Sequence, residues 1–252
     1  MNDQIKALNN FLLAAEKIML FTGAGISTNS GIPDYRGPQG VWKTRQPVYF
    51  DDFMSSYAAR VEYWDFKLES WENYKHVQPN SIHRAIAKIE KAGKMLLLVT
   101  QNVDGLHVLA GNSREKLVEI HGTDRLVECM QCHEFTDPDA HFELFKKTQE
   151  PPACHSCGGI LKPATISFGQ SLRQDDLQRA YDAASECDCV LALGSTLSVH
   201  PAASLPLAAA RRGIPYIIIN RGNTDHDGLS YVSLRIDGDV ADYLPAAVEM
   251  GI

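Results

Sequence analysis

Short, nearly continuous apolar runs alternate along this chain with segments whose apolar residues recur every three or four positions. The runs lie at residues 18–21, 95–100, 190–193, 216–220 and 233–236. Such runs are typical of strands that are buried on both faces of a parallel sheet. Segments with helical spacing lie at residues 4–16, 81–91, 175–185, 202–211 and 240–250. This alternation predicts an α/β fold with a doubly wound parallel sheet.

Two stretches interrupt this alternation. Residues from about 37 to 79 contain all three tryptophans, Trp42, Trp64 and Trp71, and no clear buried strand. This composition predicts a helical insert. Residues from about 126 to 162 are rich in Cys, His and Pro and have little apolar periodicity. They predict a small module that is held together by something other than a hydrophobic core.

Composition and charge narrow the class of protein. The 252 residues are 44% hydrophobic and 22% charged, which is ordinary for a globular protein and excludes collagen and low-complexity disorder. The formal net charge of −7 argues against a protein that coats DNA or an anionic membrane. The first residues have no basic segment ahead of a long apolar run, and the chain has no apolar stretch of about 18 residues. We therefore expect a cytoplasmic protein without a membrane span.

Four of the six cysteines form two C-x-x-C pairs. Cys129 and Cys132 make the first pair, Cys154 and Cys157 make the second, and 21 residues lie between the two pairs. Two such pairs can supply the four thiolates of a tetrahedral structural Zn²⁺ site, and with four protein ligands no position is left for water. Disulfides or loose thiols remain the alternative. The other two cysteines are expected to be buried thiols.

A glycine-rich loop follows the first predicted strand. Its sequence is Thr22-Gly23-Ala24-Gly25-Ile26-Ser27. A strand, a glycine turn and a helix start together can offer backbone N–H groups to a phosphate. Thr28 stands where the dinucleotide-binding fingerprint has its third glycine, so a simple tight turn remains the alternative.

Longer strings carry a resemblance to a known family. They are T-G-A-G-I-S-T-N-S-G-I-P-D-Y-R-G at 22–37, T-Q-N-V-D-G-L-H at 100–107, H-G at 121–122 and G-S-T-L-S-V-H-P at 194–201, with F-G, I-N and G-D-V at 168, 219 and 238. The chain resembles the sirtuins, which are NAD-dependent protein-lysine deacylases. The resemblance runs from about residue 22 to residue 240.

The resemblance implies a division of the chain into two domains. A large Rossmann-like domain would comprise residues 1–36, 78–126 and 163–252. A small domain would combine a helical module, residues 37–77, with a zinc-binding module, residues 127–162. NAD⁺, the co-substrate, and an acyl-lysine would meet in the cleft between the domains, and one structural Zn²⁺ would be bound per chain.

The resemblance also implies roles for individual residues. His121 would be the base that deprotonates a ribose hydroxyl, and Asn102 and Asp104 would complete the catalytic group; Asp104 could instead be a helix cap. The residues expected to contact NAD⁺ are Gly23, Ala24, Gly25, Thr28, Tyr35, Arg36, Gln101, Asn102, Val103, Asp104, Gly194, Ser195, Thr196, Asn220, Arg221 and Val240. Those expected to contact the substrate, bound as an added strand, are Ile166, Phe168, Gly169 and Val199.

The chain departs from the common sirtuin pattern at several positions. Tyr35 stands where Phe is usual, and Gln170 replaces a Glu. Sirtuins that accept acidic acyl groups share a Tyr-x-x-Arg pair, and the alignment of this segment places Asp65 and Leu68 at its two positions. We therefore expect short neutral acyl groups, acetyl foremost, to be preferred over succinyl.

Three functions are compatible with these residues. The first is lysine deacetylation that yields nicotinamide, lysine and O-acetyl-ADP-ribose. The second is protein mono-ADP-ribosylation, and the third is a non-catalytic NAD-sensing or zinc-ribbon binding module. His121 favours the first, because neither ADP-ribosyl transfer nor simple binding requires a base at the ribose. The expected partners are proteins or peptides that carry acyl-lysine, without nucleic acid or membrane, and we expect a monomer.

Overall fold

The large sheet of the molecule is fully parallel. The computed structural model describes residues 3–37 and 40–252. Six strands pair in the order β3-β2-β1-β7-β8-β9. Their bounds are β1 (Ile18–Thr22), β2 (Met95–Thr100), β3 (Leu117–Glu119), β7 (Cys189–Leu193), β8 (Tyr216–Asn220) and β9 (Leu234–Asp237). Because strand order reverses on either side of β1, the sheet is doubly wound, as predicted.

The apolar runs located five of these six strands to within one residue at each end. Strands β1, β7 and β8 are buried along their whole length, which is why their sequences are continuously apolar. The sixth strand, β3, was missed because three residues are too few to show a pattern.

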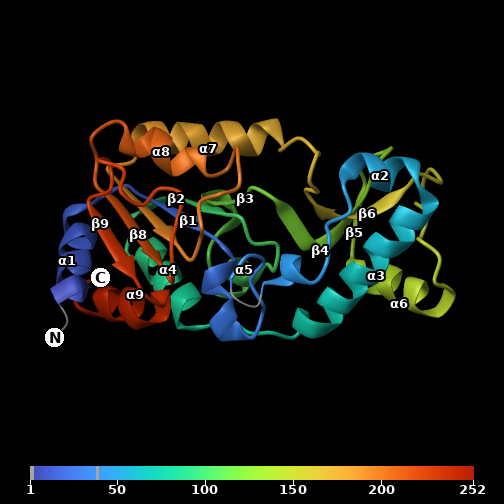
Figure 1. The fold of residues 1–252 in the computed structure, drawn as a ribbon, viewed down its shortest axis with the longest axis horizontal. Helices are drawn as coiled ribbons and strands as arrows, with labels where there is room; N and C mark the ends of the chain where they lie inside the picture. The colour runs from blue at the N-terminus through green and yellow to red at the C-terminus, as the bar shows by residue number, and fades with distance from the viewer. Residues whose placement is uncertain (1–2, 38–39) are drawn as a thin grey trace.

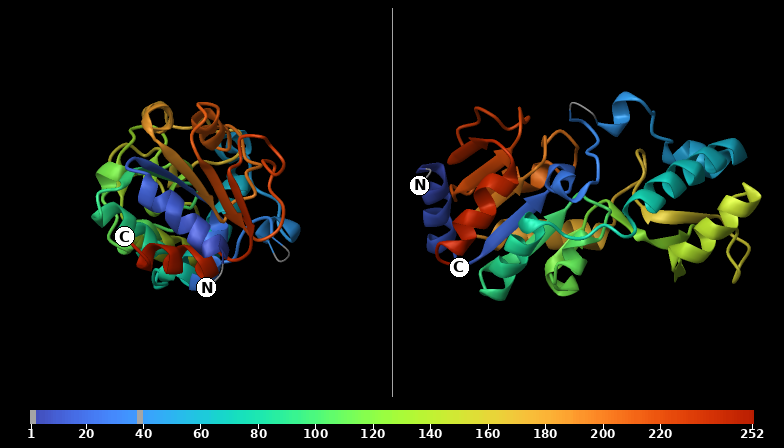
Figure 2. Two further views of the ribbon diagram at one scale, coloured as in Figure 1. Left: turned by 90° about the vertical axis from the view of Figure 1, so that its left-hand side faces the viewer. Right: turned by 90° about the horizontal axis from the view of Figure 1, so that it is seen from below.

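Helices cover both faces of the large sheet (Figures 1 and 2). One apolar core lies between the sheet and α1 (Asp3–Ala14), α4 (Ser81–Lys91) and α9 (Val240–Glu249). A second core lies between the opposite face and α7 (Gln174–Glu186) and α8 (Ser204–Ala210). These five helices match the predicted ones to within two residues at each end. No helix in the described ranges is both long and apolar enough to cross a membrane.

A second, smaller sheet lies at the other end of the molecule (Figure 1). It is antiparallel, with the order β5-β4-β6, and consists of β4 (Gly122–Cys129), β5 (Phe135–Thr136) and β6 (Leu161–Thr165). Beside it lie α2 (Phe50–Ser55), α3 (Tyr57–Tyr74) and α6 (Pro138–Thr148), so the predicted helical insert does form helices. Strands β4 and β6 run across the domain boundaries expected at residues 126 and 163.

The small sheet has a hydrophobic core, contrary to expectation. Trp64 of α3 is fully buried against Phe142 and Phe145 of α6, with ring centroids 5.3 and 6.0 Å apart. Val127 and Leu161 of the sheet belong to the same cluster. The prediction of a module without a hydrophobic core was wrong, because the apolar partners of this segment come from α3, far away along the chain.

Candidate active site

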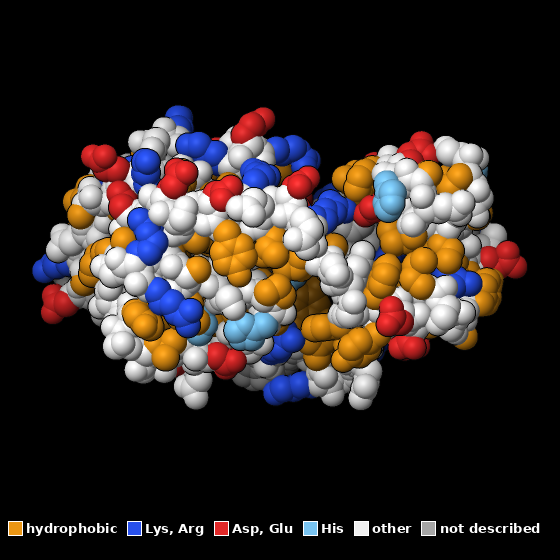
Figure 3. Space-filling model, turned by 90° about the horizontal axis from the view of Figure 1, so that it is seen from above, with side chains coloured by type: hydrophobic (Ala, Val, Ile, Leu, Met, Phe, Trp, Pro, Cys, Tyr) orange, Lys and Arg blue, Asp and Glu red, His pale blue; other side chains and the backbone are white. Residues whose placement is uncertain are grey.

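A cavity of about 1410 Å³ lies between the two sheets, and the space-filling view shows this face of the molecule hollowed between its larger and smaller parts (Figure 3). Loops that follow the carboxyl ends of β1, β2, β7 and β8 line one side of the cavity, which is where open α/β sheets bind ligands. Residues of α3, β6 and the loop after β6 line the other side.

Almost every residue expected from the sequence to act in catalysis or to contact NAD⁺ or the substrate lines this single cavity. They are Gly23, Ala24, Gly25, Thr28, Tyr35, Arg36, Gln101, Asn102, Val103, His121, Ile166, Phe168, Gly169, Gly194, Ser195, Thr196, Val199, Asn220, Arg221 and Val240. Asp104 is the exception and lies behind the wall, only 5% exposed.

The glycine loop packs tightly against the loop after β7. A Cβ atom on Gly25 would lie 2.8 Å from the carbonyl oxygen of Gly194, so no larger residue fits. The N–H groups of Gly23 and Gly25 donate to the carbonyls of Leu193 and Gly194, at 3.0 and 2.9 Å. The loop continues as a short 3₁₀ turn, Ala24–Ile26, and not as an α-helix. These two amides are already bonded and so are not available to a phosphate, which agrees with the alternative of a tight turn for this part of the loop.

Asn102 and Asp104 are joined through a serine that the sequence analysis had not singled out. The Ser27 hydroxyl donates to the Asp104 carboxylate at 2.8 Å, and the Asn102 amide donates to the same hydroxyl at 3.1 Å. Asp104 also accepts the N–H of Leu106 at 2.9 Å, at the start of α5 (Leu106–Leu109). Burial raises the pKa of Asp104. Ser27 could have been identified from the sequence, because it lies inside the family-specific string at residues 22–37.

The ring of His121 is held in one tautomer. Its Nδ1 lies 3.2 Å from the carbonyl oxygen of Gln101. A carbonyl oxygen only accepts, so Nδ1 carries the proton and Nε2 keeps its lone pair. Burial lowers the pKa of His121, so the ring is neutral near pH 7. The geometry provides a base, with Nε2 as its accepting atom.

The backbone around His121 explains the His-Gly pair. Gly122 has φ +73°, and a Cβ atom there would lie 2.1 Å from the carbonyl oxygen of Ala164. Ile166, two residues after Ala164, donates its N–H to the carbonyl oxygen of His121 at 2.7 Å. The segment expected to bind substrate is thus fastened directly to the backbone of the histidine.

Tyr35 stacks on Trp42 at the cavity wall, with ring centroids 5.2 Å apart. Burial raises the pKa of Tyr35 to about 12, so its hydroxyl stays protonated at neutral pH. This residue can cover part of the cavity as the usual Phe would, with a neutral polar atom added.

The alignment of α3, the helix expected to select the acyl group, was out of register. Asp65 is exposed and pairs with Arg45 at 3.7 Å, and Leu68 packs into the core of the small sheet. The α3 residues that line the cavity are Tyr63, Phe66 and Lys67. The physical reason given for excluding acidic acyl groups therefore fails, because it used two residues outside the cavity.

Lys67 lines the cavity but was not among the site residues expected from the sequence. It is 7% exposed, and its Nζ donates to the two carboxylate oxygens of Asp124 at 2.9 and 3.1 Å. The hydroxyl of Tyr74 donates to the same carboxylate. Burial alone would lower the pKa of Lys67, but the adjacent carboxylate outweighs it and raises that pKa. A lone lysine among aromatic residues gives no sequence signal for such a pair.

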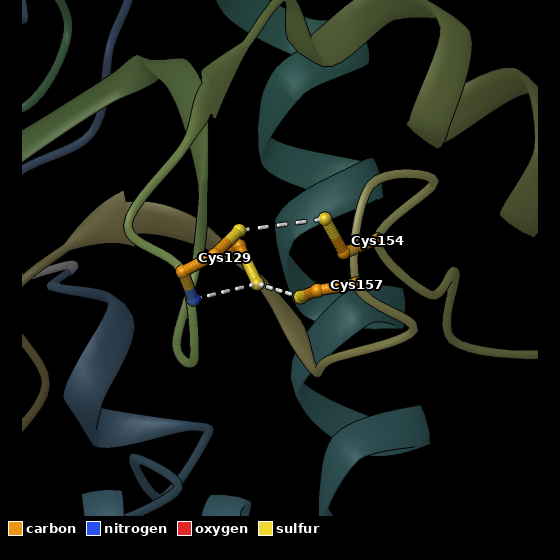
Figure 4. Close-up of side chains that lie close together, drawn as sticks. Cys129, Cys154 and Cys157 are labelled. Atoms are coloured by element: carbon orange, nitrogen blue, oxygen red, sulfur yellow. Dashed lines mark hydrogen bonds between the residues drawn. The ribbon is translucent and has the colours of Figure 1, made fainter.

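The four paired cysteines come together in space, and Figure 4 labels three of them, Cys129, Cys154 and Cys157. Their sulfur atoms all lie within 4.8 Å of one another, with Cys129 and Cys157 at 3.5 Å and Cys132 and Cys154 at 3.8 Å. These distances exclude disulfides, whose S–S bond is about 2.05 Å. A tetrahedral Zn²⁺ with Zn–S bonds of about 2.3 Å places its sulfurs about 3.8 Å apart. The four thiolates therefore fit a structural zinc ion.

Comparison with known proteins decides the family. The Sir2 family profile matches residues 23–201. The chain belongs to the Sir2 family. It is 39% identical over 233 residues to an NAD-dependent protein deacetylase of Rhodopseudomonas palustris, with 92% of each chain covered. It is 38% identical over 233 residues to NAD-dependent protein deacetylase 1 of Bradyrhizobium diazoefficiens, covering 92% of this chain and 91% of the relative.

Solved structures agree with this membership. A Sir2 enzyme is 36% identical and superposes with a TM-score of 0.86, covering 99% of this sirtuin and 98% of the solved chain. A solved complex of Sir2 with a p53 peptide and NAD⁺ is 32% identical and has a TM-score of 0.88. The match covers 100% of this chain and 99% of the solved chain. The resemblance found in the sequence is confirmed, as is the Rossmann-like fold.

Proposed function

We propose that this sirtuin is an NAD-dependent protein-lysine deacetylase. It converts NAD⁺, acetyl-lysine and water to nicotinamide, lysine and O-acetyl-ADP-ribose. The observation that carries the proposal is the placement of a neutral His121, with Nε2 unprotonated, in the same cavity as Asn102 and the substrate segment at Ile166. Relatives and solved structures at 31–39% identity, named for this activity or this family, support it.

The chemistry divides between NAD⁺ and the side chains. NAD⁺ supplies an electrophilic ribose carbon, with nicotinamide as the leaving group. We propose that Nε2 of His121 accepts the proton of a ribose hydroxyl, so that this oxygen can attack the acyl carbon. Asn102 and Gln101 position the ribose. Asp104, whose carboxylate is held by Ser27, orients the nicotinamide carboxamide from behind the cavity wall.

The remaining contacts follow the order of the loops around the cavity. We propose that the loop at 23–28 and Arg36 hold the cofactor from one side, while the Tyr35 ring shields the reacting carbon from water. Ser195 and Thr196 bind phosphate, Asn220 binds the adenosine ribose, and the adenine lies between Arg221 and Val240. The substrate peptide lies against Ile166, Phe168, Gly169 and Val199 as an added strand.

We also propose the domain division given by the sequence: residues 1–36, 78–126 and 163–252 in the large domain, with 37–77 and 127–162 in the small one. The Zn²⁺ held by the four cysteines supplies a structural cross-link and no catalytic chemistry. Acyl-lysine proteins are the partners, the chain acts as a monomer in the cytoplasm, and neither nucleic acid nor membrane takes part.

One experiment tests this proposal. The protein is incubated with NAD⁺ and a panel of acetyl-, propionyl-, succinyl- and long-chain acyl-lysine peptides, and both products are followed by mass spectrometry. Loss of the acyl group together with O-acyl-ADP-ribose supports deacylation. A peptide that gains ADP-ribose would indicate mono-ADP-ribosylation, and NAD⁺ binding without turnover would indicate a binding module.

A further inference from the structure

Lys67 brings a charged group into a part of the cavity wall whose other side chains are uncharged. It lines the cavity together with Tyr63 and Phe66 from the same helix, and with Thr165 and Ile166 from the opposite side. Its Nζ lies 5.7 Å from the centroid of the Tyr63 ring and 6.0 Å from that of Phe66. A buried ammonium is expected to have a full set of hydrogen-bond partners, because burying a charge without them costs free energy.

The hydrogen-bond partners of this ammonium are incomplete. A lysine ammonium has three N–H donors. Over residues 3–37 and 40–252, the acceptors of Lys67 Nζ are the two carboxylate oxygens of Asp124, at 2.9 and 3.1 Å. At least one N–H is therefore left without a protein acceptor, on a side chain that lines the cavity. The site can donate one more hydrogen bond to a ligand.

The charge of this donor is already balanced. Asp124 is 2% exposed, and its carboxylate accepts from Tyr74 as well as from Lys67, so the pair has no net charge. A ligand carboxylate that approached Lys67 would also approach the Asp124 carboxylate and be repelled. Lys162 does not line the cavity, and its Nζ donates to the carbonyls of Pro163 and Thr165. A neutral acceptor fits this donor better than an anion.

Hydroxyl groups extend the polar wall. The Tyr63 hydroxyl lies 2.8 Å from the Thr165 hydroxyl, and both residues line the cavity. The Ser167 hydroxyl donates to Tyr63 at 3.4 Å. A ligand hydroxyl can accept from Lys67 and donate to one of these oxygens, which neither a methyl group nor a ketone can do.

We infer that the acyl site of this chain recognises short acyl groups that carry a hydroxyl, through the third N–H of Lys67. The inference rests on the proposed deacylase function and names the class of acyl group within it. Acetyl-lysine remains a substrate, and hydroxyacyl-lysine becomes the preferred member among chains of equal carbon number.

The test compares acyl groups that differ by one oxygen. On one peptide sequence, kcat/KM is measured for lactyl- against propionyl-lysine and for 3-hydroxybutyryl- against butyryl-lysine, using both enantiomers. A hydrogen bond from a charged donor corresponds to a preference of about 10- to 150-fold in at least one pair. In the variant Lys67→Met/Asp124→Asn, which removes both charges together, that preference should fall to about one.

A control variant isolates the buried pair. Lys146 and Glu72 form an exposed ion pair on the same side of the molecule, with side chains 52% and 43% exposed. The variant Lys146→Met/Glu72→Gln carries the same chemical changes and should keep the wild-type ratios.

The possible outcomes separate the inference from the proposed function. Ratios at or below one in both wild-type pairs overturn the inference, and this holds even if the double variant does not fold. Ratios that survive the double variant also overturn it, and so does succinyl-lysine as the best substrate. Failure to deacylate any peptide, acetyl included, would instead remove the proposed function itself.

Discussion

Replacement of His121 by alanine tests whether this side chain is the catalytic base. The carbonyl of Gln101 fixes the tautomer, so Nε2 is the one ring atom able to accept a proton. Removing a positioned general base costs about 10²–10⁴-fold in rate, which is about 3–5 kcal/mol in activation free energy. NAD⁺ binding should change little, because the ring acts after nicotinamide has left.

The pH dependence gives a second and independent measurement. Burial lowers the pKa of His121 below its ordinary value of 6.5, so the active neutral form predominates at pH 7. As pH falls, protonation removes the base, and kcat/KM should therefore decline only below pH 6.5. The alanine variant should lose this acid limb.

The assay measures O-acetyl-ADP-ribose formation across pH on an acetyl-lysine peptide, with NAD⁺ affinity measured in parallel. The matched control is His76→Ala, since His76 is exposed and does not line the cavity. The assignment is refuted if His121→Ala keeps more than about a tenth of wild-type turnover, or if its acid limb is the same as that of the wild type.

Four further predictions follow from the geometry. Cys154→Ser should contain well under one zinc per chain by metal analysis and have a lower Tm; wild-type zinc content and Tm would contradict the site. Asp124→Asn leaves the Lys67 ammonium buried without its counter-charge and should lower the free energy of unfolding in urea by about 3–5 kcal/mol, so an unchanged value would disprove the pair. Gly122→Ala should reduce kcat/KM by at least about tenfold, because its Cβ would lie 2.1 Å from a carbonyl oxygen. The control Gly213→Ala has a similar φ of +80° but no such contact, and it should leave kcat/KM unchanged. On one peptide, deacetylation should exceed desuccinylation in kcat/KM, because the ion pair in the cavity wall has no net charge; the reverse order would contradict it.

Much of the large sheet was predictable because its signals are local. A strand buried on both faces needs an unbroken apolar run, and β2 and β8 were located with both ends correct. The bounds of α4 were also correct, and its start is explained by a capping box in which Asn80 and His83 bond each other's backbone N–H groups. Each of these features is contained within a dozen residues.

The core of the small sheet and the part of the cavity lined by α3 were not predictable for the opposite reason. The core of the small sheet joins α3 to α6, which are separated by more than sixty residues of sequence. The Lys67–Asp124 pair spans 57 positions. A single lysine and a single aspartate have no periodicity, so no local pattern could show that they meet, and the register of α3 was wrong by the one or two positions that decide which side chains face the cavity.

Two residues that follow the His-Gly pair, Asp124 and Arg125, hold the T-Q-N-V-D-G-L-H segment in place, although they belong to neither motif. The backbone N–H of Asp124 donates to the carbonyl of Val103 at 2.9 Å, and Nε of Arg125 donates to the carbonyl of Asp104 at 2.8 Å. The Arg125 guanidinium also lies 5.2 Å from the ring of Trp71 on α3. The loop expected to hold nicotinamide is therefore fastened, through two consecutive residues, to the helix that lines the cavity with Tyr63, Phe66 and Lys67. Because α3 contacts this loop and also lines the cavity, a change that shifts α3 should alter the proposed nicotinamide site and the proposed acyl site together, although neither sequence motif includes that helix.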